Sequence, residues 1–207
     1  MKRITFLALA IVLAFSAISQ EQNVPYEIKT ILGKNTSHGG YFGLSWGYSQ
    51  VNGKDAVIGG ARLGWIINHS FAMGVAGSGF ANNVSYKSAE NGSDYYLSGG
   101  CGGLFFEPII GSRLPIHVAF PVTIGVGDAQ LNQTFYNGAE PWETFVTDEN
   151  AFMFVEPGVA IELNMLKHFR IAVGVSYRYT SPIRLEYLSA SVLNGLSGTV
   201  TLKFGKF

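Results

Sequence analysis

The stretch from Phe154 to Arg178, FVEPGVAIELNMLKHFRIAVGVSYR, alternates apolar and polar residues almost throughout. From Val155 to Leu163 every second residue is apolar, and glutamate, glycine and alanine lie between them. From Arg170 to Tyr179 the pattern returns, with isoleucine, valine and tyrosine on one side and arginine, glycine, alanine and serine on the other. A period of two predicts strands that each have one apolar and one polar face.

The charged residues within these strands indicate which face is enclosed. Glu156, Glu162, Arg170 and Arg178 cannot face lipid, so they must face an interior while the apolar face points outward. That arrangement predicts a transmembrane β-barrel. The alternative is a soluble β-sandwich or lipocalin-like barrel with the apolar face inside. It would carry more Lys, Asp, Thr and Ser on the polar faces than the Gly, Ala and Ser found here, which suit a narrow lumen.

The composition also favours a membrane barrel over a soluble domain. Charged residues make up 14% of the 207 residues and glycine contributes 26, whereas a soluble domain averages about 25% charged residues. With Lys2 and Arg3 removed, 12 basic residues remain against 14 acidic ones, a net charge near −2 that does not suit a nucleic-acid binder. Cys101 is the only cysteine, so no internal disulfide forms, and export without disulfides fits a bacterial envelope.

The first residues have the composition of a targeting segment. Lys2 and Arg3 precede an apolar run from Ile4 to Phe15, and small residues follow at a cleavage site. The alternative is a retained membrane anchor. We expect a signal peptide over 1–19, a periplasmic segment over 20–39, and a barrel over 40–207.

Eight strands are expected, joined as an antiparallel up-and-down meander. The turns after the second, fourth and sixth are short, and the loops after the third, fifth and seventh are longer, as in outer-membrane barrels. Tyr48, Tyr95, Tyr96, Tyr177 and Tyr179 form the expected outer aromatic girdle, and Trp65, Phe71, Phe106 and Phe169 the inner one. The expected strands are 40–51, 55–68, 71–84, 94–108, 116–128, 151–163, 169–179 and 195–204.

Alternation places seven charged residues in the lumen, with His117 near one end. They are Arg62, Glu107, Glu156, Glu162, Arg170, Arg178 and Lys203. The interior of an eight-stranded barrel is just wide enough for side chains to fill it, and an unpaired buried charge is costly. The prediction is a plug of ion pairs. The alternative is a gated ion path or a substrate site with Glu156 and Glu162 as acid and base.

The expected loop from Ala129 to Asn150 is acidic and contains no Lys or Arg. Loops carry function more often than the walls that support them, so it is the candidate partner-binding surface. The alternative is a solvated cap whose aromatic residues rest on the barrel rim or on lipid headgroups. Its candidate residues are Phe135, Tyr136, Glu140, Trp142, Glu143, Asp148 and Glu149.

The chain resembles the small eight-stranded outer-membrane β-barrel proteins of Gram-negative bacteria, of the OmpX and OmpA membrane-domain type. The resemblance rests on the signal segment, on Gly40-Tyr41-Phe42-Gly43 and on the strand pair 154–179. Terminal Phe207 also fits, because such barrels usually end in an aromatic residue that the barrel-insertion machinery reads. In the alternation of the last strand, however, Phe207 does not fall on the face that Val200, Leu202 and Phe204 share. The resemblance implies contact with outer-membrane lipid and lipopolysaccharide in the bacterial outer membrane.

The sequence offers no set of residues for catalysis. No histidine is placed with a serine and an acid at the outer rim, and no two histidines have zinc-binding spacing. We therefore expect a non-enzymatic protein without metal or cofactor, which acts in surface interaction with an extracellular protein or glycan, or in envelope integrity. A narrow pore or conduit for small or hydrophobic solutes is the first alternative. An enzyme that modifies outer-leaflet lipid is the second.

Overall fold

The computed structural model describes residues 36–51, 54–82, 94–137, 140–185 and 188–207. The chain divides into two compact units, Met1–Gly33 and Lys34–Phe207. All described residues belong to the second unit. The expected signal peptide and most of the expected periplasmic segment lie outside the described residues, so both stay predictions. None of the described residues forms a helix long and apolar enough to cross a membrane.

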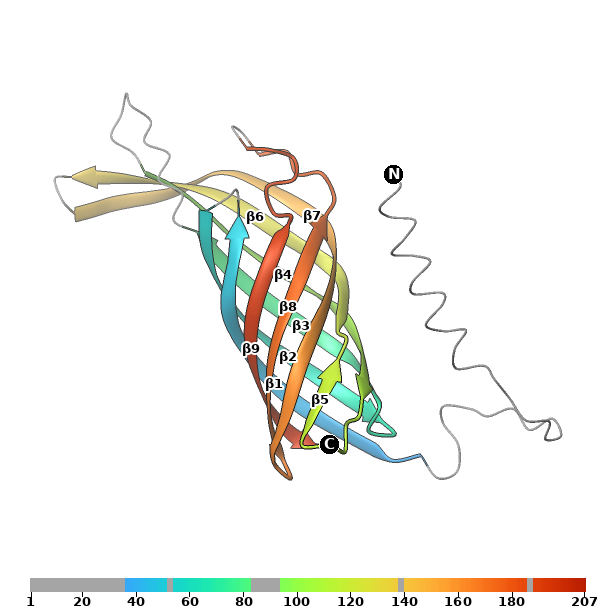
Figure 1. Cartoon of the computed structure of the whole chain (residues 1–207). Helices are drawn as coiled ribbons and strands as arrows, with labels where there is room; N and C mark the ends of the chain where they lie inside the picture. The colour runs from blue at the N-terminus through green and yellow to red at the C-terminus, as the bar shows by residue number, and fades with distance from the viewer. Residues whose placement is uncertain (1–35, 52–53, 83–93, 138–139, 186–187) are drawn as a thin grey trace. The chain divides into compact units, whose positions relative to one another are not determined.

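The second unit is a closed antiparallel barrel (Figure 1). Apart from β5 and β6, strands that are consecutive in the chain pair with one another, and β1 pairs with β9 to close the ring. β5 and β6 share one position between β4 and β7, so the ring has eight positions, and the predicted all-β eight-stranded meander is confirmed. The strands are β1 His38–Val51, β2 Lys54–Ile67, β3 Phe71–Asn82, β4 Asp94–Ile110, β5 Ile116–Ala119, β6 Val122–Asn137, β7 Glu140–Leu166, β8 Phe169–Thr180 and β9 Gly195–Lys206.

The fifth expected strand is interrupted at Phe120 and Pro121, between β5 and β6. Proline has no N–H group to donate to the neighbouring strand. The backbone still bridges the break, because Phe120 N donates to Pro108 O at 2.9 Å and Gly158 N donates to Pro121 O at 2.8 Å. Pairing with β4 also keeps one register on both sides of the break. The break therefore does not open the wall.

The prediction of a long loop from Ala129 to Asn150 is wrong. These residues extend β6 and β7 into a paired hairpin that runs from Ala129 opposite Asn150 to Asn137 opposite Glu140. Register shifts after Leu131 and Phe135 interrupt the alternation, which hides these strands in the sequence. We call this segment the outer hairpin.

Two ends of the barrel are defined by the connections. At the turn end, β1 begins, β9 ends, and short turns join β2 to β3, β4 to β5, and β7 to β8. The first of these turns has three residues, with positive φ at Asn68 and His69, 53° and 58°, and Ser70 N donates to Ile67 O at 3.2 Å across them. The outer hairpin and the 181–194 loop lie at the opposite end, which we call the loop end.

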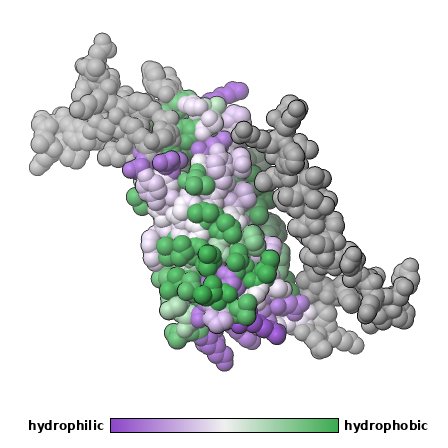
Figure 2. Space-filling view, in the orientation of Figure 1, coloured by the Kyte–Doolittle hydropathy of each residue, from purple (hydrophilic) through white to green (hydrophobic). Residues whose placement is uncertain are grey.

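The barrel is apolar on its outside. Figure 2 shows a dense patch of apolar side chains on the lower half of the visible wall, above strongly polar ones at the turn end, while the upper half of this face is mostly of intermediate hydropathy. Large apolar residues exposed on the outside include Trp46, Val57, Leu63, Val126, Ile161 and Val173, between 48% and 69% exposed. The soluble alternative requires the reverse arrangement, with apolar residues inside and polar ones outside.

Candidate functional site

Lys203 on β9 is the centre of a buried ion cluster inside the barrel, nearer the turn end. Its Nζ lies 2.7 Å from Glu107 Oε1 and also contacts Glu162 Oε1. The three side chains are 2%, 1% and 0% exposed. Inward-facing positions of β4, β7 and β9 supply them, so this cluster links three strands across the lumen.

Four more side chains surround the two carboxylates through hydrogen bonds and ion pairs. Arg62 Nη1 lies 3.4 Å from Glu107 Oε2, and Tyr41 Oη donates to Glu107 Oε1 at 3.3 Å. His117 Nε2 lies 3.0 Å from Glu162 Oε2, and Arg170 Nη1 lies 3.6 Å from the same oxygen. Each carboxylate thus has at least three polar neighbours, as buried charges need. We call these seven residues the lower network.

A second ion pair lies nearer the loop end. Arg178 Nε donates to Glu156 Oε2 at 2.7 Å, and Ser176 Oγ donates to Glu156 Oε1 at 2.7 Å. The Arg178 guanidinium also lies 5.9 Å from the ring centroid of Phe80 and 6.0 Å from that of Phe154. Since aromatic faces attract cations, the rings help to hold Arg178 in place. The structure thus places all seven sequence-predicted lumen charges inside the barrel, in two groups.

A cavity of about 90 Å³ lies in the lumen, and its mixed polar and apolar lining includes residues of both ion groups. A cavity needs only about 10–15 Å³ of such space to hold one water molecule, so several waters fit. Glu156 and Glu162 both line the cavity, but each carboxylate already accepts bonds from basic or hydroxyl groups. The other polar lining residues include Ser45, Ser78, Cys101, Thr123, Thr199 and Thr201.

An apolar cap closes the lumen at the loop end. The 181–194 loop contributes four buried side chains to it, Ile183, Leu185, Val192 and Leu193. They pack against inward-facing residues of the wall, namely Val51, Ala56, Ile58, Phe80, Leu97, Ala129, Phe152 and Phe154. The cap was not predicted from the sequence, although this one loop contains five apolar residues that signal burial, Ile183, Leu185, Leu188, Val192 and Leu193.

The turn end is closed by aromatic and apolar side chains. Tyr41, Phe105 and Ile109 belong to one buried cluster there, and Phe207 packs against it. The Phe207 ring lies 6.0 Å from the Tyr41 ring, and the Arg170 guanidinium lies 4.0 Å from its centroid. Phe207 therefore packs inside the barrel, whereas Phe204 is 45% exposed and stacks on Phe169 outside.

The candidate partner-binding residues lie on the outer hairpin. Glu149 is exposed and Asp148 is half-buried. The side chains of Phe135, Tyr136, Glu140, Trp142 and Glu143 lie outside the described part of the structure, so their role stays a prediction. Within the described ranges, no group of three or more His, Cys, Asp or Glu side chains is placed to hold a metal ion.

No protein-family model matches the chain, and no curated protein matches it. Solved structures do. The N-terminal β-barrel domain of Pseudomonas aeruginosa OprF aligns at 10% identity and a TM-score of 0.47, covering 80% of this chain and 96% of that one. Neisserial surface protein A aligns at 13% identity and a TM-score of 0.47, covering 84% and 100%.

A third match is Ail, the attachment invasion locus protein of Yersinia pestis, solved in complex with the heparin analogue sucrose octasulfate. It aligns at 12% identity and a TM-score of 0.44, covering 81% of this chain and 96% of Ail. At these identities and scores the likeness concerns architecture and says nothing about activity. The pairing of the strands around the ring itself makes this chain an eight-position antiparallel β-barrel with a charged, closed lumen.

Proposed function

We propose that this protein is a non-enzymatic barrel of a Gram-negative outer membrane that presents a binding surface at its loop end. The observation that carries the proposal is the inverted polarity of the barrel. Large apolar side chains are exposed around the wall, while Arg, Lys and Glu are buried inside. Soluble monomers rarely expose apolar patches larger than a few hundred Å², so lipid is the environment that suits this wall.

In this membrane the turn end faces the periplasm, where the mature chain begins. The expected signal peptide over 1–19 would bring the chain there. Because Phe207 packs inside the finished barrel, the insertion machinery would read it before the barrel closes. The wall would contact outer-membrane lipid and lipopolysaccharide. The lumen acts as a plug that stabilises the barrel.

The closed lumen gives the first test, by conductance in planar bilayers. We expect no steady channels, because the apolar cap, the lower network and the Phe207 cluster block the path in series. The observation that favours the pore alternative is the cavity in the lumen, which would conduct if all three obstructions moved apart. Regular single-channel steps from the purified full chain would contradict a closed lumen and support the pore alternative.

The outer hairpin gives the second test. Four acidic residues and no Lys or Arg lie between 129 and 150, so a basic or neutral protein or glycan fits this surface better than a polyanion does. We expect the full chain in nanodiscs to bind an oligolysine peptide and not heparin. Glu140→Gln, Glu143→Gln and Glu149→Gln together should reduce peptide binding about tenfold at low salt. Heparin binding by the wild type would contradict this assignment.

A further inference from the structure

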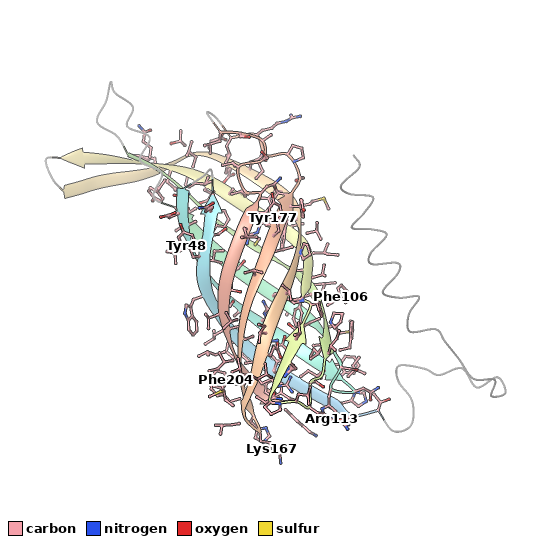
Figure 3. All side chains as sticks on the ribbon, viewed as in Figure 1. Tyr48, Phe106, Arg113, Lys167, Tyr177 and Phe204 are labelled. Atoms are coloured by element: carbon pink, nitrogen blue, oxygen red, sulfur yellow. The ribbon has the colours of Figure 1, made fainter. Side chains whose placement is uncertain are left out.

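Three exposed cations lie at the turn end of the barrel. Arg113 is in the turn between β4 and β5, Lys167 is in the turn between β7 and β8, and Lys206 is the last residue of β9. Figure 3 shows Arg113 and Lys167 at this same end. None of the three forms an ion pair with an acidic side chain in the described ranges. We call Arg113, Lys167 and Lys206 the basic rim.

Hydrogen bonds between the turns hold the rim in place. Asn164 Nδ2 donates to Ser112 O at 3.1 Å and to Leu114 O at 2.7 Å, on either side of the rim arginine. Gly205 N donates to His168 O at 3.0 Å, and His168 Nδ1 lies 2.9 Å from Gly205 O. These contacts join the residues next to both rim lysines. The three cations therefore extend from one connected edge.

Few acidic groups oppose the rim. The segments that form the turn end, 36–40, 66–70, 108–117, 163–170 and 204–207, contain no Asp or Glu. The terminal carboxylate of Phe207 is the acidic group in this region and offsets one charge. Glu107 and Glu162 lie nearby, but inside the lumen, where Lys203 and the arginines already pair with them. Among the described residues, the side-chain charge presented to the outside at this end is therefore positive.

An exposed apolar belt adjoins the basic rim. Leu166, next to the rim lysine in sequence, is 70% exposed, and Leu114, next to the rim arginine, is 59% exposed. In Figure 3 Phe204 lies just above Lys167 along the wall. Apolar and aromatic residues beside long cationic side chains are typical of a membrane–water interface, where the cations reach out to the headgroups.

Given the membrane position proposed above, we infer that the basic rim binds the phosphate groups of anionic phospholipids in the leaflet at the turn end. Arginine donates to phosphate through a planar fork, and lysine attracts it as a point charge. The three cations come from three separate places on the edge, with apolar side chains next to two of them. Such an arrangement fits individual lipid headgroups around the barrel better than a single acidic protein surface.

The test compares lipid binding by the mature full chain in phosphatidylcholine vesicles. Spin-labelled phosphatidylglycerol and spin-labelled phosphatidylcholine are added separately, and the ratio of their association constants is measured. In the variant Arg113→Gln/Lys167→Gln/Lys206→Gln we expect the preference for phosphatidylglycerol to fall up to about fivefold at low salt, since the three cations bind separate headgroups and each favours binding at its own site by about that factor. Added salt should lower the wild-type preference toward that of the variant.

The matched control is Arg184→Gln, which removes one exposed cation from the loop end. It should leave the lipid preference unchanged. An unchanged preference in the triple variant overturns the inference, as does an equal loss in the Arg184→Gln control, because the effect would then reflect net charge alone. If the wild type does not insert into the vesicles, the proposed function fails. If it inserts and shows no lipid preference, only the basic rim inference fails.

Discussion

Replacing Lys203 by methionine is expected to lower the free energy of unfolding by about 3 kcal/mol. The methionine fills a similar volume but leaves two buried carboxylates, Glu107 and Glu162, without their shared ammonium group. Removing one partner of a buried ion cluster costs more stability than the intact interaction contributes, because the remaining charges are still buried away from water. Urea titration of the barrel in detergent, together with the temperature at which the folded band disappears on unboiled gels, measures the effect.

Lys206→Met is the control, because it removes an exposed lysine from the same strand and should change stability by less than about 0.5 kcal/mol. Adding Glu107→Gln to Lys203→Met should cost clearly less than Glu107→Gln costs alone, since contacting residues are not additive. Wild-type stability in the Lys203→Met variant would show that the lower network does not stabilise the barrel.

Valine at Gly125 is expected to destabilise the barrel by about 3 kcal/mol or to prevent its folding. Gly125 on β6 faces Gly103 on β4, and both point into the lumen. A methyl group added at Gly125 would overlap the carbonyl oxygen of Gly102 and come within 2.7 Å of the Gly103 Cα. Backbone atoms of a paired strand cannot rotate away, so glycine is required for this close approach.

The matched substitution is Gly59→Val, on the outside of β2, where an added Cβ meets nothing within 4 Å. It should fold with a stability within about 0.5 kcal/mol of the wild type. Refolding yield into detergent micelles and urea titration compare the two variants. Equal behaviour of the two would show that the close approach of β4 and β6 does not depend on glycine.

Strand positions could be predicted because the two faces of the wall require different side chains, so apolar and polar residues alternate along each strand. A shift by one residue in β7 or β8 would put Glu162 or Arg170 on the exposed apolar outer face of the wall. Every expected strand therefore overlaps an observed one. The inward direction of the seven charged residues follows from the same alternation.

The loop end was harder to predict, because apolar and polar residues need to alternate only where a strand has one face in the lumen and the other on the outer wall. The outer hairpin pairs through its backbone and contains two register shifts, so its sequence resembles a loop. The cap was missed for a related reason. The apolar residues of the 181–194 loop indicate burial, but they have no strand or helix period that would place Ile183 and Leu193 in the barrel mouth.

The position of Lys203 in the chain has a consequence for assembly. Glu107 and Glu162 belong to β4 and β7, and Lys203 comes 96 and 41 residues after them, on the last strand. Until β9 joins β1, these two acids lack their shared counter-charge, and the interior of the incomplete barrel stays open to water. The last strand therefore completes the sheet and neutralises its interior in the same step. A chain truncated before β9 would be unstable for two reasons, because its strand edges stay unpaired and because Glu107 and Glu162 lose this counter-charge.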